Sequence, residues 1–141
     1  MEFEIFIAST DEDINLCFPV YKELRPKLNF EDLLPQVRRQ ENQSYKILAL
    51  RQNDEIKCVA GFRLCEFLAW GKIIYVDDLS TLPSARGNGF AGELLNSLIE
   101  LAKTEGCNGV HLDSGYARHV AHRLYLQKGF RLSSHHFSLE L

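Results

Sequence analysis

The sequence predicts an α/β fold, a sandwich of helices around a mixed β-sheet in the order β-α-α-β-β-β-α-β-α-β. Three observations predict it. Helical and extended patterns alternate along the chain, three consecutive extended segments with short connections indicate an antiparallel meander, and 141 residues are enough for a real core. The sequence contains no repeat, linker or low-complexity segment, so we expect a single domain over residues 1–141.

The first forty residues predict one strand and two helices. Weak alternation over residues 2–8 indicates an edge strand. A helix should begin near Ser9, because a serine three residues before a glutamate and acids in the first turn form a capping pattern. Pro19 should kink or shorten this helix, and a second helix should run from Asn29 to about Glu41. We interpret the charges of this region as a solvated helix face, with contact to a substrate as the alternative.

The middle of the chain predicts the meander. Residues 45–51, 56–67 and 73–81 have the composition of strands, and residues 52–55 and 69–72 have that of the turns between them. Because the connections are short, consecutive strands should pair in antiparallel fashion.

The last third predicts two helices and two further strands. Apolar residues at helical spacing indicate a helix over residues 89–103, and residues 110–113 resemble a short buried strand. A long helix over residues 116–128 should follow, closed by Gly129 as its C-cap. Residues 130–139 are then predicted to form a final strand.

Composition and charge exclude several classes of protein. Apolar residues make up 45% and charged residues 25%, and the net charge is −3 without a basic run, which argues against nucleic-acid binding. The N-terminus is acidic where a secretory signal needs lysine or arginine, and no apolar run approaches the roughly 20 residues of a membrane span. We therefore expect a cytoplasmic protein with no membrane partner. Four scattered cysteines and five histidines without zinc spacing predict no metal site.

The turn before the helix at 89–103 has the pattern of a phosphate site. An extended segment leads into the turn, and Gly87 and Gly89 then open the helix. The first turn of a helix has unpaired N–H groups and about half a positive charge, which favour an anion. Glycine lets the backbone approach phosphate oxygens without a Cβ in the way, and Arg86 adds a cation. A plain helix cap with an exposed arginine is the alternative.

At these residues the sequence resembles the GCN5-related N-acetyltransferases. Their acetyl-CoA signature, Arg/Gln-x-x-Gly-x-Gly/Ala, is matched by RGNGFA at residues 86–91. A second block, Ala-x-x-Leu-Tyr-x-x-x-Gly-Phe, is matched by AHRLYLQKGF at residues 121–130. Two blocks in the right order are far more specific than either alone. The resemblance covers residues 45–141 well and the first forty residues only by pattern.

The resemblance implies acetyl-CoA as cofactor. In the family the third meander strand and the strand that here spans residues 110–113 run parallel and splay apart, and the gap admits the pantetheine arm. Backbone groups of the third strand would pair with the pantetheine amides, and one of those N–H groups would polarise the thioester carbonyl. Arg118 stands where the family usually has asparagine seven residues before its tyrosine, and it could contact cofactor phosphate instead. The implied cofactor residues are Leu79, Ser80, Thr81, Arg86, Gly87, Asn88, Gly89, Phe90, Ala91, Arg118 and Tyr125.

The resemblance also implies catalytic groups. Tyr125 matches the family's tyrosine near the cofactor sulfur, and a phenol with a pKa near 10 would reprotonate the departing thiolate. A core tyrosine is the alternative. Three carboxylates are candidates for the base, in the order Asp78, Asp77 and Glu66. Because neighbours on a strand point to opposite faces, we expect only one of the two aspartates to face the substrate.

The sequence thus predicts an N-acetyltransferase that acts by direct attack, because no activated serine or cysteine with a neighbouring base is evident. Residues 118–126 resemble a subgroup that acts on small amines, which favours a small primary amine as acceptor. A protein or peptide N-acetyltransferase is the enzymatic alternative. A non-catalytic acyl-CoA sensor is the alternative from another class. The sequence leaves open whether residues 130–139 join a homodimer.

Overall fold

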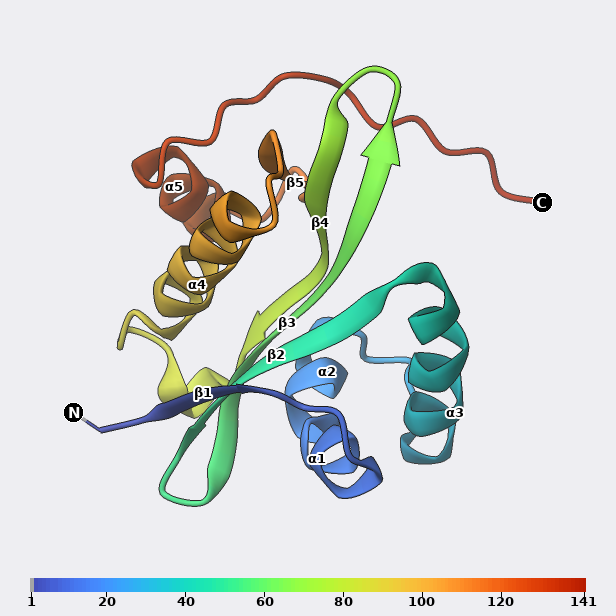
Figure 1. Ribbon diagram of the computed structural model, residues 1–141. Coiled ribbons are helices and arrows are strands. Elements are labelled where there is room, and N and C mark those ends of the chain that lie inside the picture. The colour runs from blue at the N-terminus through green and yellow to red at the C-terminus, as the bar shows by residue number, and fades with distance from the viewer. Residues whose placement is uncertain (1) are drawn as a thin grey trace. The chain divides into compact units, whose positions relative to one another are not determined.

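The computed structural model (Figure 1) describes residues 2–141 and divides the chain into two compact units, one extending to His111 and the other beginning at Leu112. The first unit contains the sheet and four helices. The second contains helix α5 (His119–Gln127) and the C-terminal segment. No helix within residues 2–141 combines the length and the apolar character that a membrane crossing requires.

One five-stranded sheet organises the first unit, with its strands in chain order β1-β2-β3-β4-β5. β1 to β4 pair in antiparallel fashion, and β5 lies parallel to β4, so the predicted meander and mixed sheet are confirmed. The β2–β3 turn places two residues at positive φ, as a tight hairpin with the right-handed strand twist requires. The strands are β1 (Glu4–Ile7), β2 (Tyr45–Gln52), β3 (Glu55–Phe67), β4 (Gly71–Thr81) and β5 (Gly109–Leu112).

Three helices precede the meander: α1 (Asp11–Leu16), α2 (Phe18–Leu24) and α3 (Phe30–Gln40). The cap of α1 is Thr10 rather than Ser9, because the Thr10 hydroxyl accepts a hydrogen bond from the Asp13 amide at 3.1 Å. The predicted effect of Pro19 is confirmed. The helix breaks at Cys17, and proline falls in the first turn of α2, where its missing N–H has no helical partner to lose.

The two faces of the sheet carry different helices (Figure 1). α1, α2 and α3 cover one face, and α4 (Phe90–Thr104) covers the other. Strand alternation supplies apolar side chains to both faces. Ile47 and Val59 are buried in the core beneath the first three helices. The helix α4 buries Leu94, Leu95 and Leu98, which gives it one apolar face along its length.

The C-terminal part differs from the prediction. The last helix begins at His119 instead of Tyr116, while Gly129 closes it at φ 93° as predicted. The final strand predicted over residues 130–139 does not form, and Phe137 and Leu139 remain exposed. A segment becomes a strand only where a neighbour satisfies its backbone hydrogen bonds. In the described chain this segment lacks such a neighbour.

Candidate active site

The turn between β4 and α4 has the backbone of an anion cradle. Gly87 and Gly89 adopt φ of 82° and 76°, a region that side-chain-bearing residues rarely enter. Gly89 is the N-cap of α4, and no side chain within the described residues caps the helix there. A Cβ built on either glycine would meet nothing within 4 Å. The first-turn N–H groups of an α-helix have no helical partner, and the turn leaves space beside both glycines, so it fits an anion such as the pyrophosphate of CoA.

The side chains of this turn have different roles. Arg86 is exposed, and its Nη2 pairs with Glu23 Oε1 of α2 at 3.1 Å. The Asn88 amide donates to the Ala85 carbonyl at 2.9 Å and so holds the shape of the turn. The Phe90 side chain is buried, so this residue offers the cradle its backbone N–H alone. Arg86 is thus the cation that the turn can present to a phosphate.

The anion cradle follows the end of β4, and the last residues of β4 extend beyond the end of β5. β5 starts beside Lys72, where the Asn108 N–H donates to the Lys72 carbonyl at 2.7 Å, and it ends at Leu112. β4 continues to Thr81. The Ser80 hydroxyl donates to the Val20 carbonyl at 2.8 Å in the core, so this residue presents only its backbone. The end of β4 is therefore a place where backbone groups can bind an extended ligand.

A β-bulge interrupts β4 just before this end. Gly61 of β3 pairs with Asp78, and the next residue, Phe62, pairs with Val76. Asp77 is therefore the extra residue of β4. Bulges often re-aim side chains beside active sites, and this one changes the direction of a predicted catalytic residue.

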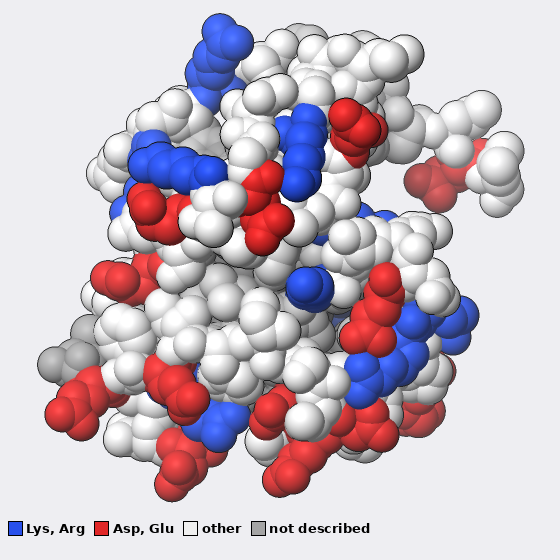
Figure 2. Space-filling view, in the orientation of Figure 1, with Lys and Arg blue, Asp and Glu red and all other residues white. Residues whose placement is uncertain are grey.

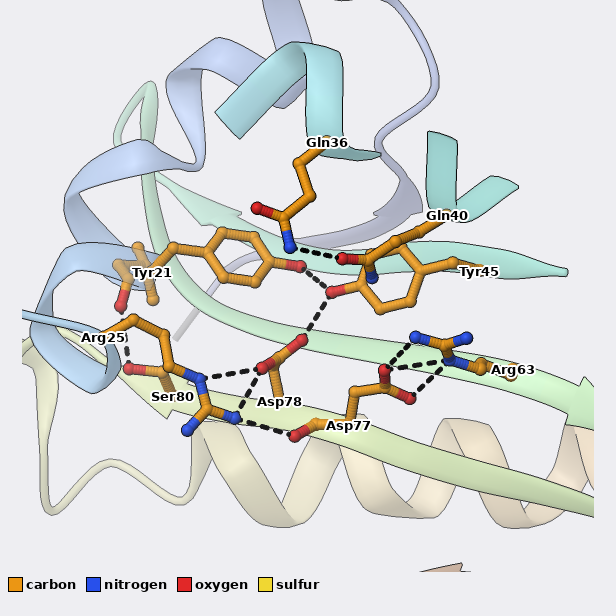
Figure 3. A network of polar contacts seen from close by, with 10 residues as sticks. Tyr21, Arg25, Gln36, Gln40, Tyr45, Arg63, Asp77, Asp78 and Ser80 are labelled. Atoms are coloured by element: carbon orange, nitrogen blue, oxygen red, sulfur yellow. Dashed lines mark hydrogen bonds and ion pairs between the residues drawn. The ribbon is translucent and has the colours of Figure 1, made fainter. Parts of the chain in front are cut away.

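The bulge turns both aspartates to the same face of the sheet (Figure 3). Asp77 binds Arg63 of β3, and Asp78 binds Tyr45 of β2. Tyr45 and Arg63 are cross-strand partners, and the Arg63 guanidinium lies 5.7 Å from the centre of the Tyr45 ring. The expectation that the two aspartates point to opposite faces is therefore wrong, because simple alternation fails at a bulge. Which of them meets the substrate stays a prediction.

Asp78 is held from two directions. Arg25, at the end of α2, donates from Nε and Nη2 to Asp78 Oδ1 at 3.1 and 2.7 Å. The Tyr45 hydroxyl donates to Asp78 Oδ2 at 2.7 Å and lies 2.7 Å from the Tyr21 hydroxyl. Burial raises the pKa of both tyrosines well above 10. Arg25 also donates to the Asp77 carbonyl at 3.1 Å, which ties the bulge to α2.

Asp77 forms a second ion pair beside the first. Arg63 donates from Nε and Nη2 to the Asp77 carboxylate at 2.7 to 3.1 Å, and from Nη1 to Gln43 Oε1 at 2.6 Å. Burial raises the pKa of Asp77, and Arg63 opposes that shift. Each carboxylate of the bulge thus has its own arginine.

The third carboxylate candidate lies elsewhere. Glu66 is exposed near the end of β3 and pairs in register with Lys72. Glu66 lies three positions after Arg63, an odd offset, so alternation puts the two side chains on opposite faces of β3. The structure does not bring Glu66 to the aspartate pair.

The second unit carries the predicted tyrosine. Tyr125 is buried on α5, with its ring centre 5.9 Å from that of Phe130. Burial raises the pKa of Tyr125 above 10, while the Arg118 charge and a hydrogen bond with Ser114 lower it. The Tyr125 phenol is therefore protonated at neutral pH. Arg118 is the N-cap residue of α5.

Sequence reasoning missed the residues that hold the aspartates, which are Arg25, Tyr45 and Arg63. It also missed Tyr21, which contacts the Tyr45 hydroxyl, and Gly61, the register partner of Asp78. One signal was present. Gly61 interrupts the apolar run of β3, and an isolated glycine within a strand pattern indicates a bulge or a close approach of another group. Both features occur at this position.

Comparisons with known proteins identify the family of the chain. The family model described as the acetyltransferase (GNAT) family matches residues 7–130. The uncharacterized N-acetyltransferase YhdJ of Bacillus subtilis (strain 168) is 31% identical over 122 residues, which cover 85% of this chain and 86% of the relative.

Two solved structures have the same fold. The ribosomal-protein-alanine N-acetyltransferase from Brucella melitensis biovar Abortus 2308 has a TM-score of 0.84 at 14% identity and is covered over the whole of both chains. The structure of AAC(6')-Iy with the bisubstrate analog CoA-S-monomethyl-acetylneamine has a TM-score of 0.83 at 13% identity, over 100% of this chain and 99% of that one.

The mixed sheet with helices on both faces places the chain in the α/β class. The chain belongs to the GNAT acetyltransferase family. It is an N-acetyltransferase that uses acetyl-CoA, the cofactor of that family.

Proposed function

We propose that this N-acetyltransferase transfers the acetyl group to a small primary amine, by direct attack of the amine nitrogen on the thioester carbon. The observation that carries the proposal is the aspartate pair at the β4 bulge, next to the stretch of β4 that extends beyond β5. A carboxylate can hold an incoming ammonium group and accept the proton that the nitrogen loses. Bound acetyl-CoA supplies the activated acetyl group.

The residues of the first unit would hold the cofactor by backbone and charge. The N–H groups of residues 87–91 would bind the pyrophosphate, with Arg86 beside them. Backbone groups of Leu79 and Thr81 would pair with the pantetheine arm, and one of these N–H groups would polarise the thioester carbonyl. Arg118 is the proposed additional phosphate contact.

Asp78 is the proposed base, with Asp77 second and Glu66 third. Asp78 Oδ1 accepts two hydrogen bonds from Arg25, while Oδ2 accepts one, from Tyr45. A carboxylate oxygen has about two acceptor positions, so Oδ2 can accept a further N–H. The exposed position of Glu66 on the other face of β3 supports its third rank.

Tyr125 is the proposed acid that returns a proton to the leaving thiolate. Its raised pKa supports this role, because the phenol keeps its proton at neutral pH. The cysteines support direct attack in place of an acyl-enzyme. Burial raises the pKa of Cys17 to about 12 and that of Cys58 to about 11, so both thiols are poor nucleophiles.

The charge balance at the bulge supports a small acceptor over a basic peptide. Arg25 and Arg63 neutralise the two aspartates, so these four residues carry no excess of negative charge. Acidic and basic side chains are interspersed on the face that Figure 2 shows. A polycationic peptide gains most from an acidic surface, whereas a small amine needs one hydrogen-bond acceptor.

The test is thiol release from acetyl-CoA against a panel of small amines, aminophosphonates, aminoglycosides and peptides. Turnover with one class of small amine supports the proposal. Turnover with peptides alone transfers the assignment to a protein or peptide N-acetyltransferase. Measurable CoA binding without thiol release for any acceptor favours the acyl-CoA sensor.

A further inference from the structure

We propose that Tyr45 is a positioning residue for acetyl transfer, which fixes the Asp78 carboxylate at the β4 bulge together with Arg25. This inference rests on the proposed function, in which Asp78 accepts the proton of the amine. It goes beyond that function by assigning a role to a side chain in the core, at the start of β2, that need not touch either substrate.

The direction of the hydrogen bonds follows from the chemistry of the groups. An ionised carboxylate only accepts, so the Tyr45 hydroxyl must donate its proton to Asp78 Oδ2. The Tyr45 oxygen can then accept from the Tyr21 hydroxyl, 2.7 Å away. The chain of donors therefore runs from Tyr21 through Tyr45 to Asp78, and every hydroxyl proton in it is committed.

This chain of hydrogen bonds ends in the core, at Tyr21. Tyr21 is 3% exposed, and Tyr45 is the partner of its hydroxyl among the described residues. A proton that entered the chain at Asp78 would have no route to water. Tyr45 therefore orients Asp78 and does not relay its proton.

Packing fixes the Tyr45 hydroxyl in turn. The ring is 2% exposed and lies beside the Arg63 guanidinium that binds Asp77. The Tyr45 ring thus lies beside Arg63, the partner of Asp77, and its hydroxyl donates to Asp78. A side chain locked by packing holds its polar atom with little freedom, which is what a positioning group requires.

These contacts determine where Asp78 Oδ2 can accept a further hydrogen bond. Tyr45 takes one of its acceptor positions and Arg25 fixes Oδ1, so the remaining position on Oδ2 has one direction in space. Without the hydroxyl, the carboxylate can rotate about the contact with Arg25. The acceptor's N–H would then meet an oxygen in the wrong place, and proton transfer depends on that geometry.

The test compares Tyr45→Phe with Tyr21→Phe. Each variant removes one hydroxyl of the same chain and keeps its ring, but only Tyr45→Phe removes the bond to Asp78. We expect Tyr45→Phe to lower kcat by about tenfold or more. CoA affinity should stay within about twofold, because the cradle is untouched. Tyr21→Phe should lower kcat by less than about threefold, although it also loses a buried hydrogen bond.

Steady-state kinetics well below the melting temperature separates positioning from stability. Equal kcat for Tyr45→Phe and wild type, or equal losses in both variants, would overturn the proposal. If wild type releases no thiol with any amine, the proposed function fails, and hydrogen exchange then decides on Tyr45. The amides of residues 75–82 should exchange faster in Tyr45→Phe than in Tyr21→Phe, and equal rates would remove the positioning role.

Discussion

The Tyr45 hydroxyl occupies the space that a Cβ on Gly61 would need. Gly61 is the register partner of Asp78, and it lies beneath the point where the Tyr45 hydroxyl reaches that carboxylate. The glycine of β3 is therefore part of the site although it contributes no side chain. Three neighbouring strands each supply one member of the contact: tyrosine from β2, glycine from β3 and aspartate from β4.

Gly61→Ala should destabilise the protein. The new methyl group overlaps the Tyr45 ring and hydroxyl, and both are held in the core, so the expected loss is about 1–3 kcal/mol of the free energy of unfolding. Urea unfolding measures it. Gly115→Ala is the control, because a Cβ there meets nothing within 4 Å. If both variants unfold at the wild-type urea concentration, the packing at Gly61 is looser than the contact implies.

The fold could be predicted because its signals are local. The Gly87–Gly89 turn, the apolar spacing of α4 and the strands of the meander each depend on residues that are near in sequence. The strand over residues 130–139 failed for the complementary reason. A strand depends on a hydrogen-bonding partner, which the residues of one segment do not reveal.

The site could be predicted only in part. The sequence points to Asp77 and Asp78 as candidates for the base. The direction of their side chains depends on a register shift between β3 and β4, which a single strand does not encode. Their partners Arg25 and Tyr45 lie 53 and 33 residues away, where no motif connects them. The charge balance at the bulge is therefore a property of the tertiary structure.

The buried tyrosines predict a loss of stability at alkaline pH. The pKa values of Tyr21 and Tyr45 are raised well above 10 in the folded chain, whereas an unfolded tyrosine ionises near 10. The unfolded state therefore binds fewer protons above pH 10, and the free energy of unfolding falls as the pH rises beyond that value. The expected fall is about 1.4 kcal/mol per pH unit for each hydroxyl.

Urea unfolding between pH 9 and 11 measures this effect for wild type and Tyr21→Phe. Cys17 and Cys58, with pKa values of about 12 and about 11 against 9.0, add their own fall from lower pH in both proteins. The difference between the two slopes therefore isolates Tyr21, and the variant should have the shallower one. Parallel slopes would mean that Tyr21 ionises as freely in the folded chain as in the unfolded one.

The pairing of Arg86 with Glu23 predicts a competition with the cofactor. Arg86 must leave Glu23 to bind a phosphate, so Glu23→Gln should tighten CoA binding, by up to about fivefold for an exposed ion pair. Arg86→Ala should weaken it by about three- to tenfold and reduce its salt dependence. Calorimetric titration with CoA at two salt concentrations measures both. Arg39→Ala removes an exposed arginine of α3 as a control for net charge. An Arg86→Ala affinity equal to that of Arg39→Ala would exclude Arg86 as a phosphate ligand.

Tyr125→Phe tests the proposed acid. The phenol is buried and its pKa is raised, so the wild-type enzyme should keep this proton throughout the neutral range and lose it only above pH 10. Removing the hydroxyl leaves the ring packed near Phe130, so stability should change little. Thiol release should fall by at least about tenfold, because the thiolate then leaves without its proton donor.

The matched control is Tyr116→Phe, which removes the hydroxyl of an exposed tyrosine in the same unit. It should leave thiol release unchanged. A good leaving group does not need an acid, so the deficit of Tyr125→Phe should shrink with an acyl donor whose thiol has a lower pKa than CoA. A deficit of the same size with both donors would assign Tyr125 to packing or cofactor binding. Turnover equal to wild type would remove it from the chemistry, and water would then be the donor to the thiolate.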